Sequence, residues 1–149
     1  QLERTITIFP WIAIIDKFQH WVYENPNHSI EERTQAWTTI AKEFSTNSID
    51  YSGLDQYRAI GWQRQLHLFE VPFYYIEYGI AQLGAIGMWM QYQKNPTLAL
   101  ENYMNALSLG GTKTLPELYQ TAGISFDFSP SYVKTLMDFT RDELEKLYQ

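Results

Sequence analysis

The chain has 149 residues, a formal net charge of −6 at pH 7 and an aromatic content of 16%. Its content of large apolar side chains excludes an intrinsically disordered protein, and its length suits a single compact domain over residues 1–149. The negative charge argues against nucleic-acid partners, which select basic surfaces, and no apolar run reaches the ~18–20 residues of a membrane span. The sequence contains no cysteine, which excludes disulfides and thiolate zinc ligands and favours a cytoplasmic location.

Apolar residues recur at helical spacing almost throughout the chain. The first predicted helix carries an apolar stripe and ends before the polar segment 24–29; the stripe consists of Trp11, Ile15, Phe18 and Val22. Pro10 lies either in the first turn of this helix or at a kink, because its ring displaces a backbone hydrogen bond.

Ser29 followed by Glu32 is a capping box, which predicts the start of a second helix. This helix places four apolar residues on one side: Ile30, Trp37, Ile40 and Phe44. After a polar connection, the pattern predicts a third helix over residues 54–68.

A break is expected at Val71, because a residue that precedes proline is pushed away from helical geometry. A long helix then restarts with Pro72 near its first turn and continues to about Gln93. Its small residues should allow close packing against neighbouring helices; they are Gly79, Ala81, Gly84, Ala85 and Gly87.

Three further helices are predicted in the C-terminal part of the chain. They cover residues 95–111, with Gly110 as the C-terminal stop, then residues 115–123, then an amphipathic segment 131–147 with Pro130 at its start. No strand alternation is present. The sequence therefore predicts an all-α fold, a bundle of about six to seven helices.

The histidines do not form a metal motif. His20, His28 and His67 are far apart in sequence, none has a partner four residues away, and no HExxH is present. We therefore expect no metal ligand within this chain.

The segment from Arg64 to Ala85 combines a histidine with closely spaced tyrosines. On a helix that restarts at Pro72, Tyr74 and Tyr75 would each lie on the same surface as Tyr78, at spacings of four and three. The pattern fits a packed aromatic helix whose hydroxyls reach the surface, and it also fits polar groups held for chemistry. Spacing alone does not separate these two interpretations.

The stretch HLFEVPFYYIEYGIAQLGA, residues 67–85, resembles the C-terminal signature of the oligoendopeptidase F family, zinc peptidases related to thimet oligopeptidase. Residues 105–126 and residues 10–26 are similar to segments of the same family, in the same order along the chain. The resemblance implies a mostly helical fold that clamps short, extended peptides in a deep channel.

In that family, two histidines of an HExxH helix and a downstream glutamate hold zinc, and the motif's own glutamate activates water there. All four residues precede the segment that this chain resembles. Because the chain also begins at Gln1, we expect it to be the C-terminal part of a larger peptidase catalytic domain. The parent would use zinc and cleave short peptides, whereas the isolated chain would bind no zinc, lack activity and self-associate through its exposed apolar surface.

Carried over residue by residue, the resemblance implies catalytic roles for His67 and Tyr78 and a substrate-binding role for Tyr75, with Tyr74 as the alternative register. A phenol O–H can stabilise the negative charge that develops on a peptide carbonyl under attack by water, and a histidine can assist. The alternative function is a helical binding or interaction module, a degenerate relative without catalysis.

Overall fold

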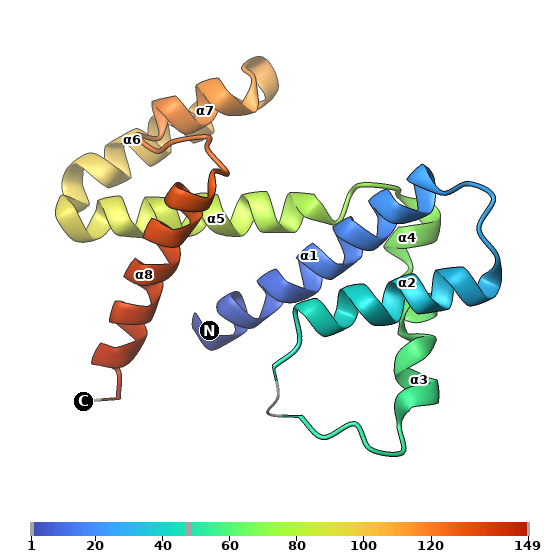
Figure 1. Ribbon diagram of the computed structural model, residues 1–149. Helices are drawn as coiled ribbons and strands as arrows, with labels where there is room; N and C mark the ends of the chain where they lie inside the picture. The colour runs from blue at the N-terminus through green and yellow to red at the C-terminus, as the bar shows by residue number, and fades with distance from the viewer. Residues whose placement is uncertain (1, 47–48, 149) are drawn as a thin grey trace. The chain divides into compact units, whose positions relative to one another are not determined.

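The computed structural model describes residues 2–46 and 49–148, and all the regular secondary structure in those ranges is helical (Figure 1). The predicted all-α class is therefore confirmed. The chain divides into two compact units, one from Thr7 to Gly79 and one that combines the N-terminal residues to Ile6 with the segment from Ile80 onward. Over the described ranges, none of the helices has the length and apolar character needed to cross a bilayer.

The first unit contains most of α1, all of α2, three short helices and the start of α5. In chain order, its elements are α1 (Leu2–Glu24), α2 (Ile30–Glu43), α3 (Asp55–Ala59), the 3₁₀ helix η1 (Gly61–Arg64), α4 (His67–Glu70) and α5 (Ile76–Lys94). Pro10 lies inside α1 and not in its first turn, because the helix begins eight residues earlier, at Leu2.

Aromatic rings from α1, α2 and η1 form the core of the first unit. Trp37 and Phe18 are each 2% exposed, and their rings meet edge to face with centroids 5.2 Å apart. The predicted stripe on α2 is therefore buried at its centre. It is wrong at Ile30 and Phe44, which are 68% and 37% exposed, because these residues lie at the two ends of the helix, outside the turns that meet the core.

The capping box at the start of α2 forms as predicted. Glu32 Oε2 accepts the backbone N–H of Ser29 at 2.7 Å, and Ser29 Oγ accepts the N–H of Glu32 at 3.1 Å. These two bonds satisfy backbone donors that a helix N-terminus otherwise leaves unpaired.

The predicted third helix over residues 54–68 is wrong, because three short helices replace it. Trp37 Nε1 donates to the carbonyl oxygen of Arg58 at 2.9 Å, and the same oxygen accepts the backbone N–H of Ile60, the residue that ends α3. A Cβ on Gly61 would lie 3.3 Å from Trp37 Nε1, so the chain passes close to the indole at this break. Tertiary contact with a buried tryptophan thus ends the helix.

The restart of the long helix at Pro72 is also wrong, since α5 begins at Ile76. Phe73 adopts a left-handed backbone conformation, with φ at 59°, which cannot belong to a right-handed helix. Tyr74 and Tyr75 therefore lie in the connection before α5 and not on the helix.

The second unit consists of the rest of α5 followed by α6 (Pro96–Ser108), the 3₁₀ helix η2 (Gly110–Thr112), α7 (Leu115–Thr121) and α8 (Pro130–Lys146). Two predicted boundaries are confirmed here. Gly110 follows α6 with φ at 52°, and Pro130 occupies the first turn of α8, where its missing N–H leaves no bond unmade.

Small residues on α5 allow close packing, as predicted. A Cβ on Gly84 would lie 2.5 Å from the hydroxyl oxygen of Tyr119, and that hydroxyl donates to the carbonyl oxygen of Ile80 at 3.0 Å. An alanine at this position would therefore displace the tyrosine from α5.

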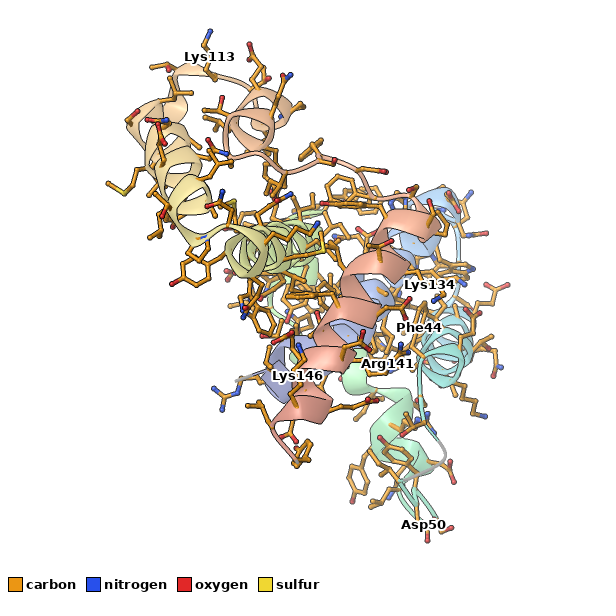
Figure 2. The ribbon with its side chains drawn as sticks, turned by 90° about the vertical axis from the view of Figure 1, so that its left-hand side faces the viewer. Phe44, Asp50, Lys113, Lys134, Arg141 and Lys146 are labelled. Carbon is orange, nitrogen blue, oxygen red and sulfur yellow. The ribbon has the colours of Figure 1, made fainter. Side chains whose placement is uncertain are left out.

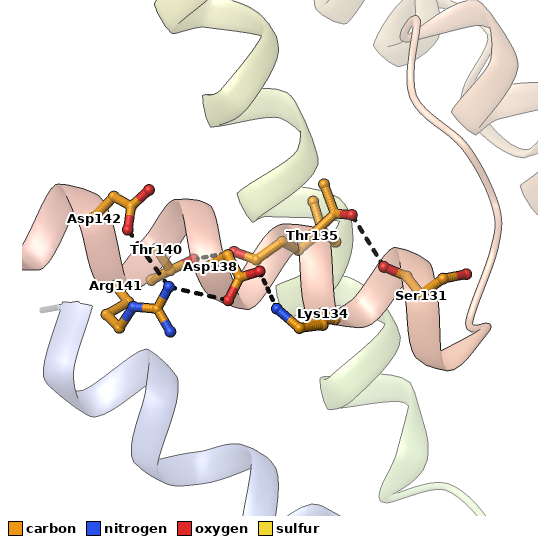
Figure 3. Close-up of polar contacts among 8 residues, drawn as sticks. Ser131, Lys134, Thr135, Asp138, Thr140, Arg141 and Asp142 are labelled. Carbon is orange, nitrogen blue, oxygen red and sulfur yellow. Dashed lines mark hydrogen bonds and ion pairs between the residues drawn. The ribbon is translucent and has the colours of Figure 1, made fainter.

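The exposed face of α8 carries a charge network that Figure 3 draws. Asp138 accepts from Lys134 at 2.5 Å and from Arg141 at 3.1 Å, and the hydrogen bond from Lys134 is the first cause that lowers the pKa of Asp138. Figure 2 labels Lys134 and Arg141 on α8 among the side chains. Such exposed pairs contribute little to stability, so we assign them no function.

Candidate functional site

The histidine and the three tyrosines of the segment 64–85 come together in the first unit, where α4 and α5 are joined by a short connection (Figure 1). The ring centroid of His67 lies 4.9 Å from that of Tyr75, 5.8 Å from that of Tyr78 and 6.2 Å from that of Tyr74. His67 begins α4, Tyr78 lies in the first turn of α5, and the other two tyrosines lie between these helices.

His67 and Tyr78 make a polar contact within this cluster, with 3.4 Å between Nε2 and the phenol oxygen. The other tyrosines surround Tyr78 edge to face, with centroid separations of 5.2 Å to Tyr75 and 5.6 Å to Tyr74. We call His67, Tyr74, Tyr75 and Tyr78 the His–Tyr cluster. All four residues singled out from the sequence are thus in one place.

The connection that carries Tyr74 and Tyr75 is held by a buried glutamine. Gln19, 3% exposed on α1, accepts the backbone N–H of Phe73 through Oε1 at 2.8 Å. The ring of Phe73 packs against His20 and Tyr23 with centroid separations of 4.9 and 5.0 Å. These contacts offset the ~1–3 kcal/mol cost of a left-handed backbone at a residue other than glycine.

Replacing Gln19 with leucine is expected to speed hydrogen exchange of the Phe73 amide about tenfold, because the N–H loses its acceptor. The free energy of unfolding of the whole chain should change less than the local stability at Phe73. The reason is that the substitution also removes a buried Nε2 that has no partner within the described part of the chain. Exchange rates followed by NMR measure both effects. Gln63→Leu, at an exposed position of η1, is the control and should leave the Phe73 amide unchanged.

A glutamine that the sequence pattern did not indicate completes the cluster. Gln65 Nε2 lies 2.7 Å from His67 Nδ1, and its Oε1 accepts the indole N–H of Trp11 at 3.3 Å. Trp11 in turn packs edge to face on Trp37, with centroids 5.8 Å apart. No spacing rule links a glutamine to a histidine two residues later, so only the fold reveals this contact.

The cluster is open to solvent on the side of the tyrosines, since Tyr78 is 42% exposed. Its pKa is nevertheless raised, first because part of the phenol is removed from water and then because Tyr74 and Tyr75 are close. The raised pKa means that the surroundings favour the neutral phenol, which can donate a hydrogen bond, over the phenolate.

Titration of Tyr78 should therefore be half complete only above pH 10.0, its ordinary value. Because the folded pKa is raised, the neutral phenol contributes stability below that ordinary value, and the contribution is lost as pH rises through the folded pKa. NMR of ring-labelled tyrosine, assigned with Tyr78→Phe, measures the titration. Half-ionisation at or below pH 10.0 would contradict the proposed environment, and Tyr74→Phe should lower the pKa.

The remaining histidines have separate protein partners. His28 Nε2 accepts from Arg33 Nε at 2.6 Å, and His20 lies 3.6 Å from a carboxylate oxygen of Asp16. Among residues 2–46 and 49–148, no three side chains of the His, Cys, Asp or Glu type gather where they could hold a metal ion. The described residues thus do not fit a zinc site of their own.

A hollow of about 790 Å³ in the first unit lies between α1 and α2 and is lined by His20, Trp21 and His28 among others. The His–Tyr cluster does not line it. We base the candidate site on the cluster, because there a histidine converges with three phenols that can donate hydrogen bonds.

Comparison with known proteins identifies the family of this chain. The model of peptidase family M3 matches residues 2–138. A solved structure described as PZ peptidase A with inhibitor 2 is 34% identical, with a TM-score of 0.87 over 97% of this chain. This chain spans only 26% of that one, and no match was found among curated proteins. On the family match, which covers most of its length, the chain belongs to peptidase family M3.

Proposed function

We propose that residues 1–149 supply the substrate-binding and oxyanion-stabilising groups of a zinc-dependent metalloendopeptidase that hydrolyses short peptides, of the oligoendopeptidase F type. The observation that carries this proposal is the convergence of His67 with Tyr74, Tyr75 and Tyr78 in a chain of peptidase family M3. We place the activity in the cytoplasm, as the lack of cysteine favours.

The chemistry follows from the donors of the cluster. Attack of water on a peptide carbonyl moves negative charge to the carbonyl oxygen, and a phenol O–H or an imidazole N–H can donate to that oxygen. Tyr78 is suited to this role because it is 42% exposed, which leaves it accessible to a substrate, while its ring packs on the other tyrosines of the cluster. His67, whose Nε2 lies 3.4 Å from that phenol oxygen, can assist by donating to it, which polarises the O–H that faces the substrate.

Tyr75 and Tyr74 have a positioning role in this proposal. Their rings lie 4.9 and 6.2 Å from the ring of His67, so a peptide whose carbonyl meets His67 also meets an aromatic surface. Tyr74 is 48% exposed, which leaves its hydroxyl available to a main-chain group of the substrate.

The catalytic metal lies outside this chain in the proposal, since residues 1–149 contain no HExxH. Zinc would polarise the carbonyl and activate water. The chain covers about a quarter of the matched peptidase structure, 26% of its length, so other residues of the parent can provide the ligands. The isolated chain should accordingly show no peptidase activity.

The test is to determine the coding sequence that precedes Gln1 and to assay the encoded full-length protein on short peptides. An in-frame HExxH with a downstream glutamate, together with cleavage that a chelator abolishes and zinc restores, is the expected result. An upstream region without these residues, and a full-length protein that binds peptides without cleaving them, would instead establish a helical binding module. Chelator-sensitive cleavage by the isolated chain would refute the proposal that the zinc ligands lie outside residues 1–149.

A further inference from the structure

We infer that Gln65, anchored by Trp11, is a positioning residue that fixes the tautomer of His67 and makes Tyr78 the terminal donor of a one-way hydrogen-bond chain. The tautomer follows from the contacts alone. Its consequence for peptide hydrolysis rests on the proposed function.

The orientation of the glutamine amide is set by the indole. The nitrogen of Trp11 can only donate, so the amide atom that it meets at 3.3 Å must be the oxygen of Gln65. The amide nitrogen then faces His67 Nδ1 at 2.7 Å.

The orientation of the amide in turn sets the proton on the imidazole. Gln65 Nε2 is a donor only, so His67 Nδ1 must accept, and neutral His67 carries its proton on Nε2. The same Nε2 lies 3.4 Å from the phenol oxygen of Tyr78, a long contact of the kind that tightens when substrate binds.

The hydrogen bonds that link Trp11, Gln65, His67 and Tyr78 all run in the same direction. The indole N–H of Trp11 donates to Gln65, the amide of Gln65 donates to His67, and Nε2–H of His67 donates to Tyr78. Because the phenol oxygen accepts from His67, its own hydrogen is directed to another acceptor, either Tyr74 or a substrate oxygen. The opposite tautomer would leave Nε2 as an acceptor and turn the phenol hydrogen back toward the histidine.

Trp11, which anchors this series of hydrogen bonds, is itself held in place by the core of the first unit. Trp11 packs on Trp37, which is 2% exposed and donates its own N–H to the carbonyl oxygen of Arg58 at 2.9 Å. The amide of a glutamine that lies between an indole and an imidazole can take two flipped orientations. Only one of them keeps the amide nitrogen, a donor, away from the indole N–H, which is also a donor.

The tautomer is measured by long-range ¹H–¹⁵N NMR of the histidine side chains in the 149-residue chain, with His67 assigned by His67→Gln. At a pH high enough that the histidines are neutral, we expect an unprotonated Nδ1 and a protonated Nε2 for His67. Gln65→Glu should shift the proton to Nδ1, because a carboxylate can only accept there. Gln63→Glu adds the same charge at an exposed position two residues away and should leave the tautomer unchanged.

A protonated Nδ1 in the unmodified chain would overturn the inference, and so would a tautomer that ignores Gln65→Glu. Trp11→Phe provides a second route to the same answer, since it frees the amide to rotate and should give a mixture of tautomers. Circular dichroism checks that each variant folds. If none of the variants folds, the tautomer measured in the unmodified chain alone tests the inference.

In the full-length protein, Gln65→Leu should lower kcat about 10–100-fold with little change in KM, the size found when the partner that orients a metal-binding histidine is lost. Gln65→Asn, which keeps an amide but shortens its reach, should not rescue. Unchanged kinetics with the expected tautomer would refute the positioning role while leaving the proposed function intact. That function fails separately if Tyr78→Phe has no effect.

Discussion

Replacing Tyr78 with phenylalanine in the full-length protein should lower kcat/KM for short peptides about 10²–10³-fold, the size measured for loss of one oxyanion donor. The substitution removes a single oxygen from an aromatic cluster whose rings stay in contact, since Tyr78 packs edge to face on Tyr74 and Tyr75. The loss should fall mainly on kcat, because the bond strengthens as charge develops on the substrate oxygen.

Tyr57→Phe is the matched control, because Tyr57 is 63% exposed on α3 of the same unit. It should leave kcat/KM unchanged. A decrease of less than about threefold for Tyr78→Phe would mean that the phenol does not take part in stabilising the oxyanion, since one lost donor costs far more. Tyr75→Phe and Tyr74→Phe should act mainly on KM and thereby decide which of them contacts the substrate.

Replacing Trp37 with alanine should destabilise the first unit by about 3–5 kcal/mol, as truncation of a large buried aromatic side chain does. Trp37 is 2% exposed and contacts both Trp11 and Phe18 edge to face. Because Trp11 anchors Gln65, the substitution should also loosen the His–Tyr cluster. Urea unfolding followed by circular dichroism measures the loss, and the His67 side-chain resonances report the cluster.

Trp37→Phe separates packing from hydrogen bonding. It keeps a ring in the core and removes the donor to Arg58, whose carbonyl oxygen still accepts from the N–H of Ile60. Its cost should therefore be smaller than that of the alanine variant, with about 0.5–1.5 kcal/mol from the hydrogen bond. A cost below 1 kcal/mol for Trp37→Ala would contradict the packing described for this core.

Much of the local structure could be predicted because neighbouring residues determine it. The capping box of Ser29 and Glu32 needs only side chains three residues apart. Gly110 tolerates the left-handed conformation that follows a helix, and Pro130 suits a first helical turn. Each of these signals is contained in a few consecutive residues, and each is present in the structure.

The errors arose where a distant residue decides the local conformation. The predicted helix over 54–68 breaks where the indole of Trp37 takes the carbonyl oxygen of Arg58, and α5 starts late because Gln19 holds Phe73 in a left-handed conformation. Both partners lie on other helices, beyond the reach of periodicity.

The candidate site could be predicted in part. The resemblance of residues 67–85 pointed to His67 and the tyrosines, and these residues are brought together. Gln65 and Trp11 could not be predicted, because their importance arises from a contact between residues 54 positions apart. The expected self-association of the isolated chain stays a prediction that light scattering can test.

The most direct test of the central claim, that His67 and Tyr78 stabilise the charge that develops on the peptide oxygen, uses a transition-state analogue. The measurement is the inhibition constant of a phosphinic peptide for the full-length protein, Tyr78→Phe and His67→Gln. Affinity for the analogue should fall in parallel with kcat/KM across these variants, because both quantities report binding of the transition state. A fall in kcat/KM with unchanged affinity for the analogue would contradict the claim.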